Sequence, residues 1–478
     1  MPIGDDTELD ELIAGPEETH PGQSGFRLLD SGLDAFAVRG RSAVLAGRSL
    51  DVQTYIWHAD ASGRFLAHRL LEAADRGVQV RILVDDFDAR AKNDKFAALD
   101  AHENIEVRIF NPFKSRRGFF GKVFELVGDF GRLNHRMHNK SWIADNRIAV
   151  AGGRNLGDEY FNASGNINFV DLDFAMIGPI VRDVSAAFDE YWNSPAVHPV
   201  ADLESMDVEP AALEQLRSNL AAHAQEASDS EYARRLANDE SVQALASGDW
   251  PMEWTAEYEF VADDPLKATL GEPGPERSRV LGALTPLIEG AERNAKLISP
   301  YFVPGENGTA ILTRVADDRD VEILTNSLAA TDVAAVHGGY ARNREDLLEA
   351  GVVLYEMKPQ PGEGGGSGFL GSQGTSLHTK ALTVDGDTLF VGSYNLDPRS
   401  TSLNCEQGIL VKNDVLAGQL EAIFDRQRDG ARAWRVTLQD GDLSWSDGTK
   451  TLDSEPDATM GRRFQAWIAR LLRLDAQL

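Results

Sequence analysis

Two copies of one pattern carry the chemistry that this sequence can do. Each copy has a histidine, a lysine two residues later and an aspartate five residues after that. The copies are His138, Lys140 and Asp145 in HNKSWIAD, and His378, Lys380 and Asp385 in HTKALTVD. One imidazole can attack phosphorus while a second protonates the departing alcohol, and ammonium groups can neutralise phosphate charge in the transition state. The pattern predicts phosphodiester chemistry.

A glycine-led turn follows each copy at the same distance, GGRN at 152–155 and GSYN at 392–395. Asn155 and Asn395 carry amide groups that can donate hydrogen bonds to phosphate oxygens. Gly153 and Ser393 are small enough to let a phosphate approach the backbone. We therefore interpret these four residues as substrate-binding residues.

Carboxylates downstream of each turn can hold the far nitrogen of a catalytic imidazole, which fixes its tautomer. Asp171 and Asp173 lie in NFVDLDFAMIG, and Glu406 lies in LNCEQGILV. Because both contexts are apolar, an unpaired carboxylate there is costly. We expect Asp171 or Asp173, and Glu406, each to orient the histidine of its own half. Asp145 and Asp385 close their motifs where a strand meets a turn, so we interpret them as structural turn anchors.

The elements around the motifs are also repeated. A strand, an amphipathic helix and a second strand are predicted from residue 51 onward, and the same order returns from residue 296. IEVRIFNP at 105–112 is matched by VVLYEMKP at 352–359, each a short strand stopped by proline. In a strand, a histidine and a lysine two residues apart share one face. The pattern predicts an α/β fold with helices on both faces of its sheets, and two copies related by a pseudo-twofold with the active site at their interface.

Length supports two domains, because 478 residues exceed a typical single domain about threefold. We predict an acidic N-terminal segment, a first domain, a polar helical connector and a second domain that ends in a hairpin and an amphipathic helix. Their ranges are 1–25, 26–200, 201–250 and 251–478, with the hairpin at 434–446 and the helix at 460–478.

Composition excludes several protein classes. The 42% apolar and 26% charged residues are typical of a globular protein. The net charge of −29 repels phosphate backbones and argues against nucleic acid as a partner. A single cysteine, Cys405, excludes an internal disulfide and a multi-cysteine metal site. No His, Asp or Glu cluster has ligand spacing outside the motifs, so we expect neither a metal nor a cofactor.

Two segments suit the surface of a membrane. FKSRRGFFGKVF at 113–124 interleaves basic and aromatic residues, as headgroup-contacting segments do. The helix at 461–478 carries Phe464, Trp467 and Leu471 at helical spacing among arginines; docking on the protein body is its alternative. There is no secretory signal pattern and no apolar run of membrane-spanning length. We expect a protein that rests on a membrane without crossing it.

Taken together, the motifs resemble those of the phospholipase D superfamily, and more closely the bacterial cardiolipin synthases of the C type. The resemblance is carried by HPGQSGF at 20–26, YIWHAD at 55–60, RMHNKSWIAD at 136–145, GGRNLGDEYF at 152–161 and GSYNLDPRS at 392–400. It implies two tandem phospholipase D-like α/β/α sandwich domains and metal-free phosphatidyl transfer through a phosphohistidine. By motif match His138, Lys140, His378 and Lys380 are catalytic, with His138 the nucleophile and His378 the general acid. Asp171 and Glu406 match the orienting carboxylates.

The activity implied by the resemblance is transfer of a phosphatidyl group to phosphatidylglycerol, on phospholipid substrates at the cytoplasmic face of the cell membrane. A hydrolytic phospholipase D uses the same residues, so the sequence leaves that alternative open. A phosphodiesterase nuclease is the third alternative, which the net charge disfavours.

Overall fold

A computed structural model describes residues 6–89, 91–113, 134–165, 168–203, 211–268, 274–359 and 376–472. The chain forms two compact units. Unit 1 contains residues 1–163, 173–273 and 403–409, and unit 2 contains residues 164–172, 274–402 and 410–478.

Unit 1 is built on a sheet of nine strands in the order β10-β1-β8-β6-β5-β2-β3-β4-β9. Its strands are β1 (Ser24–Leu29), β2 (Ser49–Thr54), β3 (Gln79–Asp85), β4 (Ile105–Phe110), β5 (Ser141–Ala144), β6 (Ile148–Gly152), β8 (Asp173–Ile177), β9 (Val197–Pro199) and β10 (Glu253–Thr255), and β11 (Tyr258–Ala262) lies outside this sheet. Its helices are α1 (Glu8–Thr19), α2 (Gly32–Leu45), α3 (Ala61–Asp75), α4 (Asp86–Ala89), α5 (Asn93–Asp100), α8 (Ile180–Trp192), α9 (Ala212–Ser228), α10 (Glu231–Asn238) and α11 (Glu240–Ser247).

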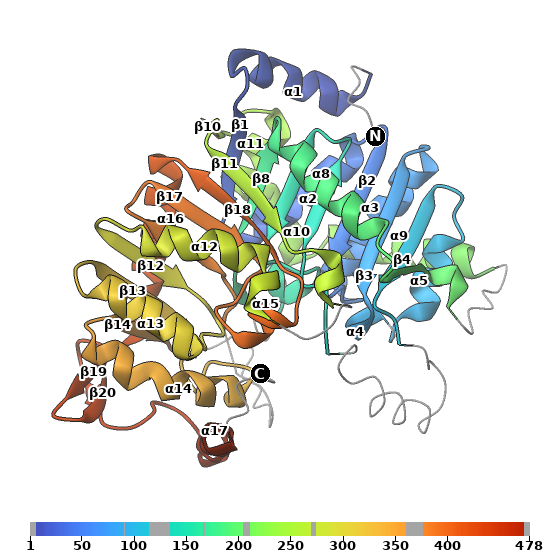
Figure 1. Ribbon diagram of the computed structural model, residues 1–478. Helices are drawn as coiled ribbons and strands as arrows, with labels where there is room; N and C mark the ends of the chain where they lie inside the picture. Colours follow the sequence, from blue (N-terminus) through green and yellow to red (C-terminus); the bar gives the residue numbers. More distant parts are fainter. Residues whose placement is uncertain are drawn as a thin grey trace. The chain divides into compact units, whose positions relative to one another are not determined.

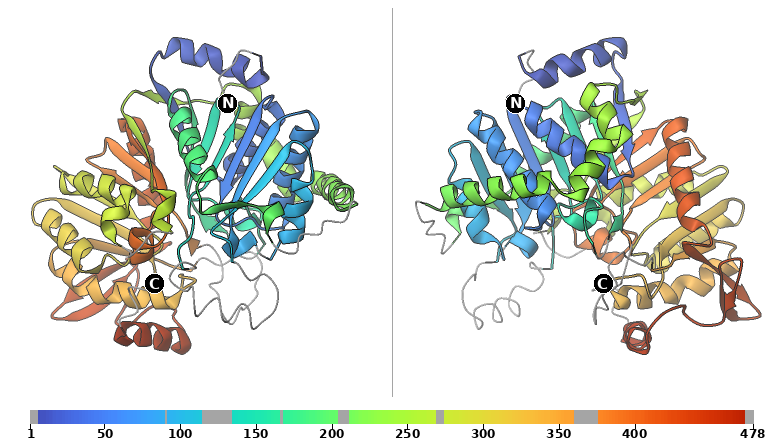
Figure 2. Two further views of the ribbon diagram at one scale, coloured as in Figure 1. Left: turned by 45° about the vertical axis from the view of Figure 1, so that its right-hand side comes forward. Right: turned by 180° about the vertical axis from the view of Figure 1, so that it is seen from behind.

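Helices cover both faces of this sheet, with α2 and α3 on one side and α8 on the other (Figures 1 and 2). Strands β2, β3 and β4 run parallel, and β5 pairs with β2 in the antiparallel sense. Every residue of β2 and of β5 is buried. Burial on both faces is what a central strand of an α/β/α sandwich requires.

Unit 2 repeats this arrangement. Its strands are β7 (Phe169–Val170), β12 (Asn294–Ile298), β13 (Asp320–Asn326), β14 (Val353–Met357), β15 (Ser376–Leu377), β16 (Ala381–Val384), β17 (Thr388–Gly392), β19 (Ala433–Gln439), β20 (Asp442–Ser446) and β21 (Thr451–Leu452), and β18 (Gln407–Lys412) belongs to it from residue 410. Its helices are α12 (Arg279–Glu289), α13 (Gly305–Ala316), α14 (Ala334–Glu349), α15 (Pro398–Ser402), α16 (Asp414–Arg428) and α17 (Met460–Leu472).

The strand order within unit 2, β17-β16-β12-β13-β14-β19, matches β6-β5-β2-β3-β4-β9 of unit 1. In both units the three central strands are parallel and the motif-bearing hairpin pairs with them in the antiparallel sense. The predicted repeat of an α/β domain is confirmed. The hairpin expected at 434–446 is β19–β20.

Each unit includes a short segment from the other half of the sequence. Residues 164–172 lie between two stretches of unit 1 but belong to unit 2, where β7 pairs in parallel with β15. Residues 403–409 are surrounded in sequence by unit 2 but belong to unit 1, where Cys405 pairs with Met137. These two exchanged segments carry the carboxylates Asp171 and Glu406.

The C-terminal helix α17 packs against α14 (Figure 1). Ala466 and Ala469 are buried on its inner face. Its outer face presents Met460, Phe464, Trp467 and Leu471, each more than half exposed. Among the described residues, no helix is both long enough and apolar enough to cross a membrane.

Gly338→Ala should weaken the packing of α17 on α14. The added methyl group overpacks this contact, and overpacking typically lowers the free energy of unfolding by about 1–3 kcal/mol. A Cβ at Gly338 would lie 2.4 Å from the carbonyl oxygen of Ala466. Hydrogen exchange of the α17 amides, measured together with thermal unfolding, checks this. The control is Gly418→Ala in α16, where a Cβ meets nothing within 4 Å; it should leave α17 unchanged, and equal protection of α17 in both variants would contradict the prediction.

Candidate active site

In unit 1, the first motif histidine is held by a carboxylate. Nδ1 of His138 lies 2.9 Å from Oε2 of Glu406, whose side chain is fully buried. The His138 backbone N–H donates to the Cys405 carbonyl over 2.8 Å. The Tyr55 ring meets the His138 ring edge-on, with 5.1 Å between centroids. With Nδ1 engaged by a carboxylate, the imidazole presents Nε2 for chemistry.

Unit 2 holds the second motif histidine in the same way. Nδ1 of His378 lies 2.6 Å from Oδ2 of Asp171, which is also fully buried. The His378 backbone N–H donates to the Val170 carbonyl over 2.8 Å. The expectation that each carboxylate serves the histidine of its own half is therefore wrong. Asp171 follows the first motif but orients the second histidine, and Glu406 follows the second motif but orients the first, because the segments that carry them are exchanged.

Asp173, the alternative to Asp171, has a different role. Its carboxylate accepts a hydrogen bond from Arg39 over 2.9 Å and one from the backbone N–H of Arg154 over 3.1 Å. All three side chains are buried. Asp173 is a partner of buried arginines rather than of a catalytic imidazole.

The motif lysines are buried beside their histidines. Lys140 donates to the carbonyl oxygen of His138, and Lys380 donates to that of His378. Nζ of Lys380 also lies 2.9 Å from Nδ1 of His378. The ammonium groups can thus neutralise an anion bound at the imidazoles.

The histidine and lysine of each motif lie just before a strand, not within one as expected. β5 begins at Ser141 and β16 at Ala381. The shared direction of the two side chains therefore depends on how the preceding residues are anchored.

Two residues that the sequence analysis missed provide this anchoring. Asp85 ends β3, and its carboxylate accepts the backbone N–H of Met137 over 2.9 Å. Asn326 ends the equivalent strand β13, where its amide accepts the Leu377 N–H over 3.2 Å and donates to the Leu377 carbonyl over 3.0 Å. Burial raises the pKa of Asp85 to about 6. Both polar residues end a buried apolar strand of the repeat, and this signal could have identified them.

Neighbouring side chains also fix Glu406. The carboxylate of Asp263 accepts the Glu406 backbone N–H over 3.1 Å and forms a buried ion pair with Lys267 over 2.6 Å. Gln407 donates to the Lys140 carbonyl over 2.6 Å and accepts from Asn139 over 3.2 Å. The exchanged segment is thus bonded directly to the first motif.

The predicted phosphate-binding residues lie just after the motif hairpins. Asn155 donates to the hydroxyl of Tyr160 over 2.9 Å and accepts the Ile56 N–H over 3.2 Å, so part of its amide is already engaged. Asn395 is buried, and its Oδ1 has no hydrogen-bond partner in the described ranges. Gly153 and Ser393 are buried directly after β6 and β17.

Asp145 and Asp385 occupy tight turns, with φ of 53° and 55°. The Asp145 carboxylate accepts the backbone N–H groups of Gly47, Arg48 and Ser49. The Asp385 carboxylate accepts those of Glu292, Arg293 and Asn294. Both carboxylates act as turn anchors in the same place of the repeat.

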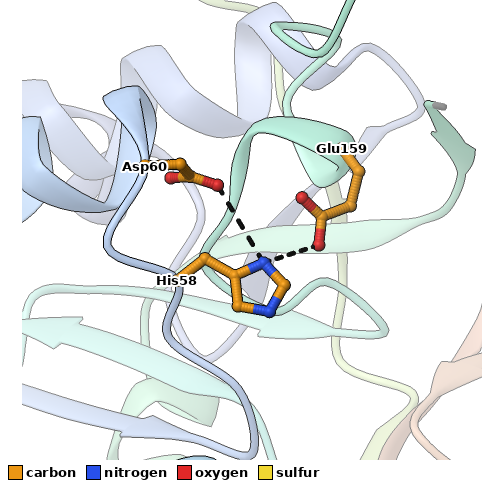
Figure 3. Close-up of side chains that lie close together, drawn as sticks. All are labelled: His58, Asp60 and Glu159. Atoms are coloured by element: carbon orange, nitrogen blue, oxygen red, sulfur yellow. Dashed lines mark ion pairs between the residues drawn. The ribbon is translucent and has the colours of Figure 1, made fainter. Parts of the chain in front are cut away.

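Within the described part of the chain, two His/Asp/Glu triplets bring together residues from separate segments of the sequence. In unit 1, Nδ1 of His58 lies 2.9 Å from Glu159 and 4.0 Å from Asp60 (Figure 3). The hydrogen bond to Glu159 raises the pKa of His58. The second triplet consists of His337, Glu356 and Glu455 and lies in unit 2.

Comparison with known proteins gives concordant matches. A family model described as "Cardiolipin synthase, PLD-like domain" matches residues 44–192 and 284–428. The chain is 40% identical to cardiolipin synthase C of Escherichia coli over 95% of this chain and 96% of that protein. It is 26% identical to cardiolipin synthase A of Pseudomonas entomophila over 88% of this chain and 69% of that protein. A crystal structure of phosphatidylserine synthase from Haemophilus influenzae shares the fold, with a TM-score of 0.62, 12% identity, and coverage of 98% of this chain and 100% of that one.

Proposed function

Since the chain belongs to the cardiolipin synthase family with phospholipase D-like domains, we propose that it transfers a phosphatidyl group to phosphatidylglycerol and so forms cardiolipin. It is a phosphatidyltransferase of the phospholipase D type. The observation that carries the proposal is that both motif histidines have Nδ1 on a buried carboxylate. That arrangement suits one imidazole to attack phosphorus and the other to transfer a proton.

In the proposed mechanism, Nε2 of His138 attacks the phosphorus of the donor lipid. The P–O bond to the headgroup alcohol breaks, and the protonated His378 gives that oxygen its proton. The product is a phosphatidyl group bonded to His138. A hydroxyl of phosphatidylglycerol then loses its proton to the neutral His378 and attacks phosphorus, which breaks the P–N bond and restores both histidines.

The lysines and the carboxylates would have different roles in the two steps. Lys140 and Lys380 would stabilise the charge on the phosphoryl oxygens as the transition state forms. Glu406 would stabilise the charge that develops on His138 as it attacks, and Asp171 would support the protonated form of His378. We propose that Asn155 and Asn395 contribute amide hydrogen bonds to the same phosphate.

The product identifies the reaction. Purified protein given labelled phospholipid and phosphatidylglycerol should form labelled cardiolipin, separated by thin-layer chromatography. Phosphatidic acid as the main labelled product would favour the hydrolytic alternative. Cleavage of plasmid DNA, with no lipid product, would replace both with a nuclease.

Activity should survive EDTA at a temperature well below unfolding, because the proposed chemistry uses only imidazoles and ammonium groups. Initial rates of cardiolipin formation before and after chelation provide the measurement. A rate that falls with EDTA and recovers with one divalent ion would contradict metal-free catalysis.

We propose peripheral contact with the cytoplasmic face of the cell membrane. The exposed outer face of α17 supports it, since Phe464, Trp467 and Leu471 present apolar surface beside the exposed cations Arg463 and Arg470. Aromatic and basic side chains together suit the headgroup boundary. Most of the aromatic-basic segment 113–124 lies outside the described residues.

Binding to anionic vesicles should weaken several-fold when Phe119 and Phe120, or Phe464 and Trp467, are replaced by Ser. Each exchange removes apolar area that would otherwise leave water. Co-sedimentation with phosphatidylglycerol vesicles measures the effect, and hydrolysis of a soluble phosphodiester should stay unchanged. If either pair leaves vesicle binding intact, that segment does not contact the membrane.

A further inference from the structure

Three side chains from distant parts of unit 2 converge inside that unit. His337 lies on α14, Glu356 on β14, and Glu455 in the segment between β21 and α17. Their side chains are 2%, 0% and 18% exposed. The cluster lies away from both catalytic motifs in the sequence, and no step of the proposed mechanism uses it.

The two distances from the His337 nitrogen to the carboxylate oxygens are those of ligands around an ion. Nε2 of His337 lies 3.7 Å from Oε2 of Glu455 and 4.0 Å from Oε2 of Glu356, and all three atoms lie within 4.8 Å of one another. Direct hydrogen bonds would bring nitrogen and oxygen to about 2.7–3.2 Å. A metal ion about 2.1 Å from each ligand atom holds those atoms about 3.4–4.2 Å apart, depending on the angle.

Two of the three atoms are buried and have no hydrogen-bond partner among the residues that the structure describes. They are Nε2 of His337 and Oε2 of Glu455. A buried polar atom without a hydrogen bond lowers the stability of the folded state. His337 as a whole is only 4% exposed. A cation between these atoms would accept a lone pair from each and remove the cost of both.

The other carboxylate oxygens are positioned by neighbours. Arg344 donates to Oε1 of Glu356 over 2.9 Å and to Oε1 of Glu455 over 2.8 Å. Trp445 donates to Oε2 of Glu356 over 2.9 Å. Burial opposes ionisation of Glu356, but the Arg344 guanidinium lowers its pKa below the ordinary value. Such outer hydrogen bonds commonly orient ligating carboxylates.

Charge also favours a cation at this place. Two carboxylates against one guanidinium leave one negative charge in the interior when the imidazole of His337 is neutral. Buried charge of this kind is normally paired or bound to a metal. A cavity of about 890 Å³, lined in part by His337, Arg344, Trp445 and Glu455, gives an ion a route to the cluster.

We propose that His337, Glu356 and Glu455 bind a divalent first-row metal ion such as Zn²⁺. One imidazole nitrogen and two carboxylate oxygens are a donor set that such ions accept. Because the ligands come from α14, β14 and the segment before α17, the ion fastens that segment to the body of unit 2. The role is structural and separate from the phosphatidyl transfer.

The other triplet lacks these features and serves as an internal comparison. His58 donates directly to Glu159 over 2.9 Å, and its side chain is 40% exposed. Both oxygens of Asp60 accept backbone N–H groups, from Gly63 over 3.0 Å and from Asp158 over 2.8 Å. The His58 triplet is satisfied without an ion.

The test measures zinc binding by untagged, full-length protein after treatment with EDTA and dialysis. We expect one equivalent of Zn²⁺ by calorimetric titration, and a melting temperature about 3–6 °C higher at 100 times the dissociation constant. His337→Gln and Glu455→Gln should each weaken binding more than 100-fold. The matched variant His58→Gln should bind Zn²⁺ as the wild type does.

Two further measurements separate loss of ligand from loss of fold. Glu455→Gln keeps an oxygen for Arg344, so its circular dichroism should match that of the metal-free wild type. Co²⁺ bound to the wild type should give visible absorption bands that His337→Gln removes. Wild-type protein that binds none of Zn²⁺, Mn²⁺ or Co²⁺ would overturn the proposal, as would binding lost in His58→Gln but kept in the other two. No readout depends on lipid turnover, so the metal site and the proposed function succeed or fail separately.

Discussion

His138→Ala should eliminate the covalent phosphatidyl-enzyme and lower turnover by a factor of about 10⁴ or more, whereas His378→Ala should trap it. A nitrophenyl phosphodiester has a leaving group that needs no general acid, so His138 can still attack when His378 is absent. The second step then lacks the base that activates the acceptor alcohol, and the adduct accumulates. A burst of nitrophenol release, together with mass spectrometry of the labelled peptide, measures both effects.

His198→Ala is the control, because His198 is exposed on the edge strand β9 and belongs to neither motif. It should behave as the wild type does. Label found on His378 in the His138→Ala variant would reverse the assignment of nucleophile and general acid. If neither variant forms an adduct and both retain turnover, the covalent mechanism is wrong.

The sequence predicts the repeated fold and the histidine–lysine pairs because these features are local. A motif of eight residues, followed by a glycine-led turn at a constant distance, can be recognised without knowledge of the tertiary structure. Periodicity likewise identifies strands such as β2 and β12, SLDVQT and NAKLI, because apolar residues alternate with polar ones in both. Because each element occurs in both halves, each copy supports the prediction of the other.

The pairing of carboxylates with histidines could not be predicted in the same way. Glu406 is 268 residues from His138, and Asp171 is 207 residues from His378. Both halves place a carboxylate next to an apolar strand, so spacing alone favoured the nearer histidine. The exchange of residues 164–172 and 403–409 between the units decides the pairing, and it depends on tertiary contacts of β7 and Cys405.

Tertiary structure also explains why the His337 triplet was missed. Metal-site motifs are recognised in a sequence when the ligands lie a few residues apart on one helix or loop. His337, Glu356 and Glu455 come from a helix, a strand and a loop, and no spacing rule relates them. Asp85 and Asn326 do carry a signal, as polar residues at the ends of repeated strands, but their backbone partners lie 52 and 51 residues further along the chain.

The crossed pairing leads to a second large effect. Glu406→Gln and Asp171→Asn should each lower turnover of natural lipid by up to about 10⁴, because an amide cannot stabilise the imidazolium and can favour the wrong tautomer. With the nitrophenyl phosphodiester, however, the two variants should separate. Asp171→Asn impairs only His378, so the burst should remain and the adduct on His138 should accumulate. Glu406→Gln impairs the nucleophile itself, so no burst should appear.

Asp173→Asn is the matched control, two residues from Asp171 and buried in the same strand region. It removes a partner of Arg39 and should lower the melting temperature without separating the two steps of the reaction. If each carboxylate instead served the histidine of its own half, Asp171→Asn would abolish the burst and Glu406→Gln would preserve it. Since both outcomes use one substrate and one assay, the comparison tests the exchanged segments directly: the carboxylate that governs nucleophilic attack must be the one that follows the second motif.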